Sequence, residues 1–283
     1  MTDHQKQYNR LSISFHQTFI PERQYITELL HFIGGGGTGT DQEISKLTGI
    51  PVGQSSGKVP AVTNYCNGMG LIVVEKATKD RQREFELTPF GRAVLLEDKN
   101  LSEELTQWLL HMHLCRRQGG AEIWHLCFAK SIEILGINFT EKSLNDYLER
   151  ICGNRSRSLI GPLINTYEEP ASLKNAKAIS RSNGGLTRTA APLLTGFRFG
   201  YSAFLLDLWD SHFPEDRQVT LSDFEAETYW SNIGAWDDRQ KENVLDMIQT
   251  TGAIKIDKLM RPWVLSRCGT GNQFWSFLYE DLA

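Results

Sequence analysis

The chain has 283 residues, a formal net charge of -4 and an apolar fraction of 40%. This composition is typical of a globular protein of two or three compact units, and it excludes a largely disordered chain or an indiscriminate nucleic-acid coat. No apolar run is long enough to span a bilayer, and the first ten residues lack the apolar core of a signal peptide. We therefore expect a cytoplasmic protein without a membrane partner.

Charge is distributed unevenly along the chain. Residues 150–200 carry eight basic side chains and two acidic ones, whereas residues 201–250 carry three basic and eleven acidic ones. The first block suits phosphate groups, and the second repels them. The alternative is that the two blocks neutralise each other across a contact between domains.

The first forty residues predict a strand, a helix and a hinge. Leu11, Ile13 and Phe15 alternate with polar residues as in a short strand, and an amphipathic helix follows Arg23. The glycine run 34–37 lacks the G-x-x-x-x-G-K-[ST] spacing of a phosphate-binding loop. We interpret it as a flexible hinge.

Residues 40–95 predict a winged helix-turn-helix. Thr40 has the position of an N-cap for a helix that Gly49 ends, and apolar residues three or four apart predict a second helix over 59–69. Two short strands over 71–75 and 83–87 then predict a wing. Such a unit docks its second helix in the major groove of DNA, although winged helices also serve as protein-interaction modules. The candidate DNA contacts are Lys58, Thr63, Asn64, Asn67, Arg81 and Arg83.

The middle of the chain predicts a helical domain with a second helix-turn-helix-like pair. Helices are expected over 89–96, 101–116 and 122–135, and the pair spans 140–167 with Thr140 as N-cap. Cations near a helix start and in the basic segment that follows suit phosphate oxygens. The additional candidate DNA contacts are Arg155, Arg157, Lys174 and Lys177.

The last third predicts the same order of elements once more. Helices are expected over 197–213, 221–231 and 237–251, followed by a hairpin over 253–267 and an aromatic-rich helix over 273–282. Because this part is acidic, we expect an interaction or dimerisation module, and a homodimer is one possibility. The predicted fold is mainly α with short β-hairpins, divided into domains 1–98, 99–195 and 196–283.

Metal-binding patterns are weak in this sequence. The five cysteines are scattered and contain no C-x-x-C pair, so buried free thiols are expected. His111 and His113 lie on different faces of a predicted helix, and His125 belongs to the next one. Structural or surface histidines explain this spacing better than a metal site.

An ordered series of short motifs resembles a domain family found in bacterial DNA phosphorothioation gene clusters. The match spans about Ser12 to Ala203, and it departs from the family pattern at Gln24-Tyr25-Ile26-Thr27, where an aromatic residue and a tryptophan are expected. The resemblance implies a protein that binds DNA and nicks one strand for a sulfur-inserting partner, beside an ATPase and a sulfurtransferase-like subunit. The motifs are Phe15-His16-Gln17-Thr18-Phe19 with Arg23; Glu86-Leu87-Thr88-x-x-Gly91 with Leu95; Leu105-Thr106-x-Trp108-Leu109-Leu110-His111; Trp124; Phe128; Ser158-Leu159; and Thr166-Tyr167.

No nuclease signature stands in one stretch of the sequence, so a nicking site has to be assembled from separated positions. The first motif offers His16 as general acid or base, Glu22 as base or metal ligand, and Arg23 as a clamp on the scissile phosphate. A divalent cation such as Mg²⁺ is a possible cofactor. The alternative is that these three residues are structural and that the protein is a non-enzymatic DNA-binding regulator or docking subunit.

Overall fold

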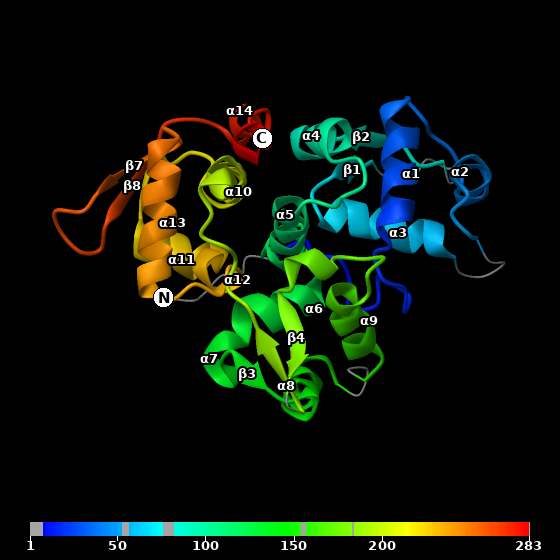
Figure 1. Cartoon of the computed structure of the whole chain (residues 1–283), viewed down its shortest axis with the longest axis horizontal. Helices are drawn as coiled ribbons and strands as arrows, with labels where there is room; N and C mark the ends of the chain where they lie inside the picture. Colours follow the sequence, from blue (N-terminus) through cyan, green and yellow to red (C-terminus); the bar gives the residue numbers. More distant parts are fainter. Residues whose placement is uncertain (1–7, 53–56, 76–81, 154–156, 183, 283) are drawn as a thin grey trace.

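The computed structural model describes residues 8–52, 57–75, 82–153, 157–182 and 184–282, without the side chains of Arg157 and Ser158. Its elements form three groups around a central helix, α5 (Glu104–Cys115), as Figure 1 shows. The protein is mainly helical and has small antiparallel sheets, which confirms this part of the sequence prediction. None of the described helices combines the length and hydropathy needed to cross a bilayer.

The first group precedes α5 in the chain. Thr40 and Glu43 form the expected capping box at the start of its second helix, and Gly49 ends that helix at a φ of 72°. The two strands are antiparallel, with Ile72 opposite Leu87. The elements are α1 (Arg23–Gly34), α2 (Asp41–Thr48), α3 (Lys58–Gly68), β1 (Ile72–Val74), β2 (Phe85–Leu87) and α4 (Pro89–Glu97).

The second group follows α5 and contains a three-stranded sheet in the order β3-β5-β4. Thr140 caps the helix that begins at Glu141 through a capping box with Ser143, and this N-cap is the one that the sequence predicts. The elements are α6 (Glu122–Trp124), the π-helical η1 (His125–Lys130), α7 (Ile132–Leu135), β3 (Asn138–Phe139), α8 (Glu141–Cys152), α9 (Arg157–Glu168), η2 (Lys174–Ala176), β4 (Ile179–Ser182) and β5 (Gly185–Arg188).

The third group completes the chain with a sheet in the order β6-β8-β7. Thr220 caps α11, and Asp237 caps α13. The elements are η3 (Thr195–Phe197), α10 (Arg198–His212), β6 (Gln218–Thr220), α11 (Leu221–Thr228), α12 (Trp230–Ile233), α13 (Asp238–Thr250), β7 (Ile254–Asp257), β8 (Val264–Arg267), α14 (Gly271–Trp275) and η4 (Glu280–Leu282).

All three groups share one order of elements: a helical segment, a short extended segment, two principal helices and a β-hairpin. A threonine caps the first of the two principal helices each time, and the residue before it pairs with the returning arm of the hairpin. The same local chemistry therefore starts each helix pair at the edge of its sheet. The pairs are Gly39 with Arg83, Phe139 with Leu186, and Val219 with Leu265.

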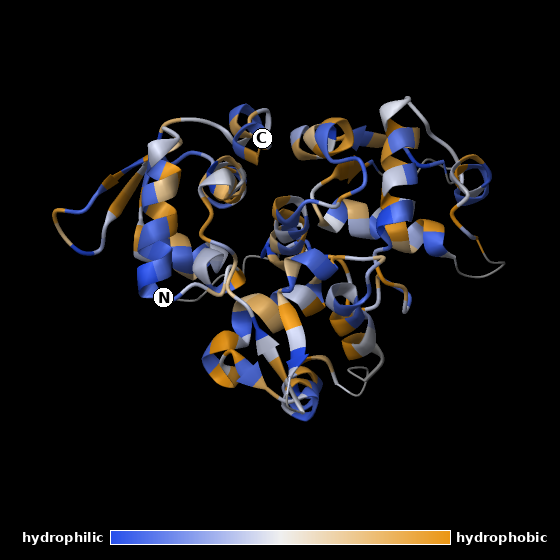
Figure 2. Cartoon of the chain, in the orientation of Figure 1, coloured by the Kyte–Doolittle hydropathy of each residue, from blue (hydrophilic) through white to orange (hydrophobic). Residues whose placement is uncertain are grey.

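The second principal helices of the three groups, α3, α9 and α13, differ in their exposure to solvent. In α3 and α9 most described side chains are buried, because other parts of the chain cover both helices. Helix α13 buries one stripe, Val244, Leu245 and Ile248, and leaves its other face in solvent. Figure 2 shows this hydrophilic face most clearly in the first turns of α13.

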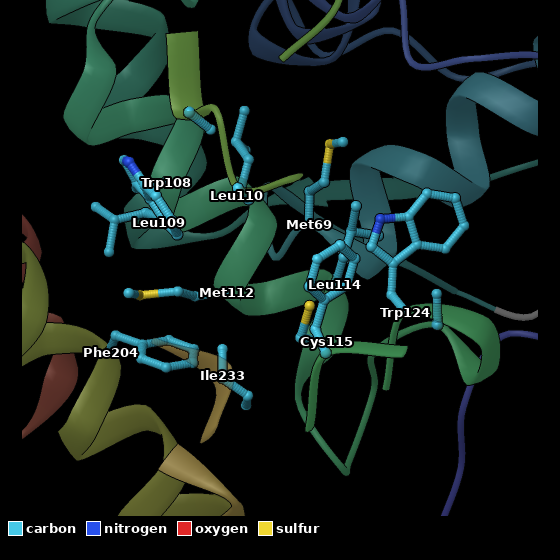
Figure 3. Packing of buried hydrophobic residues seen from close by; sticks show 14 of the residues in the cluster. Met69, Trp108, Leu109, Leu110, Met112, Leu114, Cys115, Trp124, Phe204 and Ile233 are labelled. Atoms are coloured by element: carbon cyan, nitrogen blue, oxygen red, sulfur yellow. The ribbon is translucent and has the colours of Figure 1, made fainter. Parts of the chain in front are cut away.

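The core continues through all three groups by way of α5. Every residue from Leu105 to Cys115 is buried, because other parts of the chain surround this helix on all sides. Met112 lies beside Phe204 of the third group, whereas Leu114 lies on the side of Trp124 (Figure 3). Packing on α5 therefore fixes the groups relative to one another.

Sequence predictions of secondary structure fail at three places: the N-terminal strand, the helix expected over 221–231, which Tyr229 divides into α11 and α12, and the helix expected over 273–282. Residues 13–18 form turns, and Leu11 makes one isolated bridge to Ala121, so the expected N-terminal strand is absent from the described part of the chain. This segment packs across helices, where Phe15 contacts Tyr65, rather than beside a strand. The helix expected over 273–282 is divided into α14 and η4.

Candidate functional site

The first motif folds into a buried turn in front of α1. His16 is 1% exposed, and its Nδ1 accepts a hydrogen bond from the Thr18 amide at 3.0 Å. Burial lowers the pKa of His16 to about 4, so the imidazole is neutral at physiological pH. In this conformation His16 orders the turn and is shielded from a DNA phosphate.

The other two candidate catalytic residues already have structural partners. Arg23 donates to the carbonyl oxygens of Asn100 at 3.1 Å and Pro170 at 2.9 Å, and its own amide donates to Ala171. Glu22 pairs with Lys58 at 2.5 Å. Glu22 is thus the ion-pair partner of Lys58, a candidate DNA contact. Arg23 joins the start of α1 to the loops that follow α4 and α9.

Helix α3 does not present the polar face that its sequence predicts. Thr63 is 0% exposed, so its assignment as a DNA contact is wrong for this conformation. The N-terminal segment lies against the helix, because Tyr65 donates to the carbonyl oxygen of Phe19 at 3.0 Å and Asn64 donates to that of Phe15 at 3.5 Å. Asn64 and Asn67 keep part of their surface in solvent.

The described part of the predicted wing holds its arginine in an ion pair. Arg83 Nε lies 2.6 Å from Asp41 Oδ1, and its Nη2 lies 3.2 Å from the other carboxylate oxygen. This fork-shaped pair ties the hairpin to the start of α2. Arg81 lies outside the described residues.

Two cations of the basic segment are open to solvent. Lys174 and Lys177 are exposed, and within the described residues neither forms an ion pair. Lys174 begins the short η2, which packs against α5, and Lys177 follows it. Arg155 lies outside the described residues, and Arg157 is placed only by its backbone at the start of α9.

The three central histidines, for which the sequence predicts a structural or a surface position, are buried. His111 Nδ1 lies 2.6 Å from the Tyr167 hydroxyl, and His125 Nδ1 lies 2.8 Å from the Cys115 carbonyl oxygen. Burial lowers the pKa of both to about 3 and that of His113 well below its usual value. Across the ranges that the structure describes, no group of three or more His, Cys, Asp or Glu could hold a metal ion.

One cluster of polar side chains was not predicted, because its members are far apart in the sequence. Glu227 of α11 accepts hydrogen bonds from Tyr8 and from Arg117, and His212 of α10 lies beside it. The guanidinium of Arg117 stacks on the Tyr8 ring, 4.1 Å from its centroid. A phenol, a carboxylate, an imidazole and a guanidinium therefore meet where the three groups join.

These features define a helical protein of three repeated groups packed on one buried helix. Residues 14–162 match the model of the DUF4007 family, which is described as a family of proteins of unknown function. Because this match covers more than half of the chain, the protein belongs to the DUF4007 family.

Solved structures with the same fold include two crystal structures of SspB. One has magnesium ion bound and a TM-score of 0.70 to this chain, and the other has a TM-score of 0.68. Each is 15% identical in sequence and covers 96% of this chain, and this chain covers 89% and 88% of the respective SspB chains. No curated protein matches the sequence.

Proposed function

We propose that this protein is an SspB-like, DNA-binding component of a bacterial DNA phosphorothioation system. The motif series that resembles the phosphorothioation family and the fold shared with SspB over nearly the whole chain support this proposal. The observation that carries DNA binding is the threefold order of helix, extended segment, helix pair and hairpin. We interpret this order as that of a winged helix-turn-helix, a unit that docks on DNA in many proteins and serves as a protein-interaction module in others.

Exposed cations determine where we place the DNA. The basic middle segment offers the exposed Lys174 and Lys177. In the first group, Lys58 and Arg83 would each replace a carboxylate partner with a DNA phosphate. Asn64 and Asn67 would contact DNA once the N-terminal segment moves away from α3.

Nicking of one strand is the finer part of the proposal. A divalent cation such as Mg²⁺ is the proposed cofactor, since one of the similar SspB structures has magnesium ion bound. The described residues provide no dedicated cage for such an ion, so the proposed chemistry assigns it no ligand and no step.

A non-enzymatic DNA-docking subunit or regulator is the second candidate function. It is favoured by one observation: His16, Glu22 and Arg23 are each engaged in local structure. In either case the acidic third group is the proposed contact for partner subunits, which include an ATPase, a sulfurtransferase-like protein or a second copy of this chain.

Gel retardation at several salt concentrations tests DNA binding. The double variant Lys174→Glu, Lys177→Glu should weaken binding about 10-fold or more and reduce the salt dependence by about one released counterion for each lysine. Lys255→Glu is the matched control, because Lys255 is an exposed lysine on β7. Equal affinities for all three proteins would contradict the proposed surface, and no retardation by the unaltered protein would contradict the proposed function.

Conversion of supercoiled plasmid to open circles tests nicking. The reaction is run with Mg²⁺ and with a chelator, and we expect open circles in the presence of Mg²⁺. Retardation of DNA without open circles in either condition would support the docking subunit instead.

A further inference from the structure

The polar cluster at the junction of the three groups has the composition of a phosphodiester-transfer site. Tyr8 donates a hydrogen bond to Glu227 Oε1, and Arg117 Nη1 donates to Glu227 Oε2 at 3.1 Å. His212 Nδ1 lies 3.4 Å from Glu227 Oε1. A nucleophile, a base within hydrogen-bond reach and a cation beside them are the groups that such a transfer needs.

Additional cations surround this cluster. Arg10 donates to the carbonyl oxygen of Arg117 at 3.1 Å and pairs with Glu122. The exposed Lys130 belongs to the same neighbourhood, because partial burial, Arg10 and Arg117 together lower its pKa. Within the described residues, three cations (Arg10, Arg117 and Lys130) thus lie near two carboxylates, and a phosphate group would relieve the mutual repulsion of the cations.

The side chains of this cluster differ in solvent exposure. Tyr8, Arg117 and Glu227 are each partly exposed. The side chain of His212 is 2% exposed, and it packs beside the Tyr8 ring at 5.9 Å between centroids. His212 is therefore a positioning residue for Tyr8 and Glu227.

Tyr8 is distinguished from the other tyrosines by its partner. Among the tyrosines in the ranges that the structure describes, it alone donates a hydrogen bond to a carboxylate; the others that donate do so to carbonyl, hydroxyl or imidazole groups. The pKa of Tyr8 is raised to about 12, by burial and then by Glu227. Its hydroxyl is thus protonated at neutral pH and needs a base to react.

We infer that Tyr8 is the nucleophile of a strand transfer that nicks DNA and leaves one strand end bound to the protein. This inference rests on the proposed function and names its reacting site. The phenol proton passes to Glu227 as the Tyr8 oxygen bonds to phosphorus, and the bond from phosphorus to one deoxyribose oxygen breaks. That oxygen, on the opposite side of phosphorus, takes a proton from solvent water, and Glu227 returns its own proton to solvent. Arg117 stabilises the charge on the phosphoryl oxygens.

Detection of the protein–DNA bond tests the inference. Supercoiled plasmid is incubated with the full chain, denatured, digested to short fragments and end-labelled, and we expect labelled DNA that migrates with the protein until a protease is added. Tyr8→Phe should lose this adduct and nick at least about 100-fold more slowly. Tyr147→Phe is the matched control, because Tyr147 lies on α8 away from this cluster, and it should behave as the unaltered protein.

Additional measurements separate chemistry from structure. Glu227→Gln should slow nicking, and the nicking rate of this variant should recover at alkaline pH. Loss of a purely structural hydrogen bond would not change the pH dependence of the rate. Thermal unfolding of each variant checks the fold. Nicking by Tyr8→Phe at the unaltered rate, or open circles without a protein-bound strand, would overturn the inference. DNA binding without nicking would also overturn it, yet it would leave the DNA-binding function intact.

Discussion

The Nζ atom of Lys58, the first residue of α3, lies 2.5 Å from Oε1 of Glu22, the residue before α1. The same ammonium group lies over the rings of Phe19 and Tyr25, at 5.5 and 4.7 Å from their centroids. A candidate DNA contact and a candidate catalytic carboxylate are therefore each other's partners. This ion pair joins the start of α3 to the segment that covers that helix.

Glu22→Gln separates the catalytic and structural interpretations of this pair. If Glu22 mainly holds Lys58, the variant should nick at the unaltered rate and bind DNA as well or a few-fold better, because a phosphate can then attract Lys58. Both partners are partly exposed, so stability should change by no more than about 1 kcal/mol. Nicking and gel-retardation assays measure the outcome, and loss of nicking with normal binding would restore Glu22 as a catalytic candidate.

Buried histidines should make the fold sensitive to acid. His16, His111, His113 and His125 have folded-state pKa values below the usual 6.5, because burial disfavours the imidazolium. The unfolded chain therefore binds more protons below pH 6.5, and stability should fall as the pH is lowered from 6.5 towards 4. Urea unfolding at pH 7.5 and 5.0 measures this loss.

His16→Asn provides the comparison for the acid experiment. Asparagine can accept the hydrogen bond from the Thr18 amide but does not titrate. The variant should be less stable at pH 7.5, yet it should lose less stability between pH 7.5 and 5.0. An equal loss in both proteins would show that His16 does not contribute.

Asp207 should have the opposite pH dependence. Burial raises its pKa to about 7, and the Trp275 indole donates to it at 3.0 Å. The folded chain then binds more protons than the unfolded chain between about pH 4 and 7, so this residue makes stability fall as the pH rises through that range. The melting temperature of Asp207→Asn minus that of the unaltered protein should be higher at pH 8 than at pH 5. The same difference at both pH values would contradict the raised pKa of Asp207.

Gly91→Ala should disrupt the contact between α4 and β1. A Cβ atom at this position would lie 1.9 Å from the Leu71 carbonyl oxygen, and backbone cannot yield as a flexible side chain does. We expect a loss of about 3 kcal/mol or more, measured by urea unfolding.

Gly161→Ala is the matched control for that experiment. Gly161 lies within α9, and a Cβ atom there would meet no atom within 4 Å. The substitution should be neutral or stabilise the protein by up to about 1 kcal/mol through the unfolded state. Equal losses from both substitutions would contradict the close approach at Gly91.

Local sequence chemistry determined most of the elements. Thr40, Thr140 and Gly49 are helix boundaries in the structure as their residue types predict, because capping depends on neighbours within one turn. The hairpins of the first and third groups also follow from alternation of apolar residues. The division into domains at residues 98 and 195 stays a prediction.

Tertiary structure alone decided what covers each helix and which distant side chains meet. The polar residues of α3 could not reveal that residues 11–21 lie against them, since this contact joins separate segments. Tyr8, Arg117 and Glu227 likewise carry no shared spacing, and packing of the three groups on α5 brings them together. Sequence periodicity records the direction in which a side chain points, whereas long-range packing determines whether solvent or another part of the chain lies there.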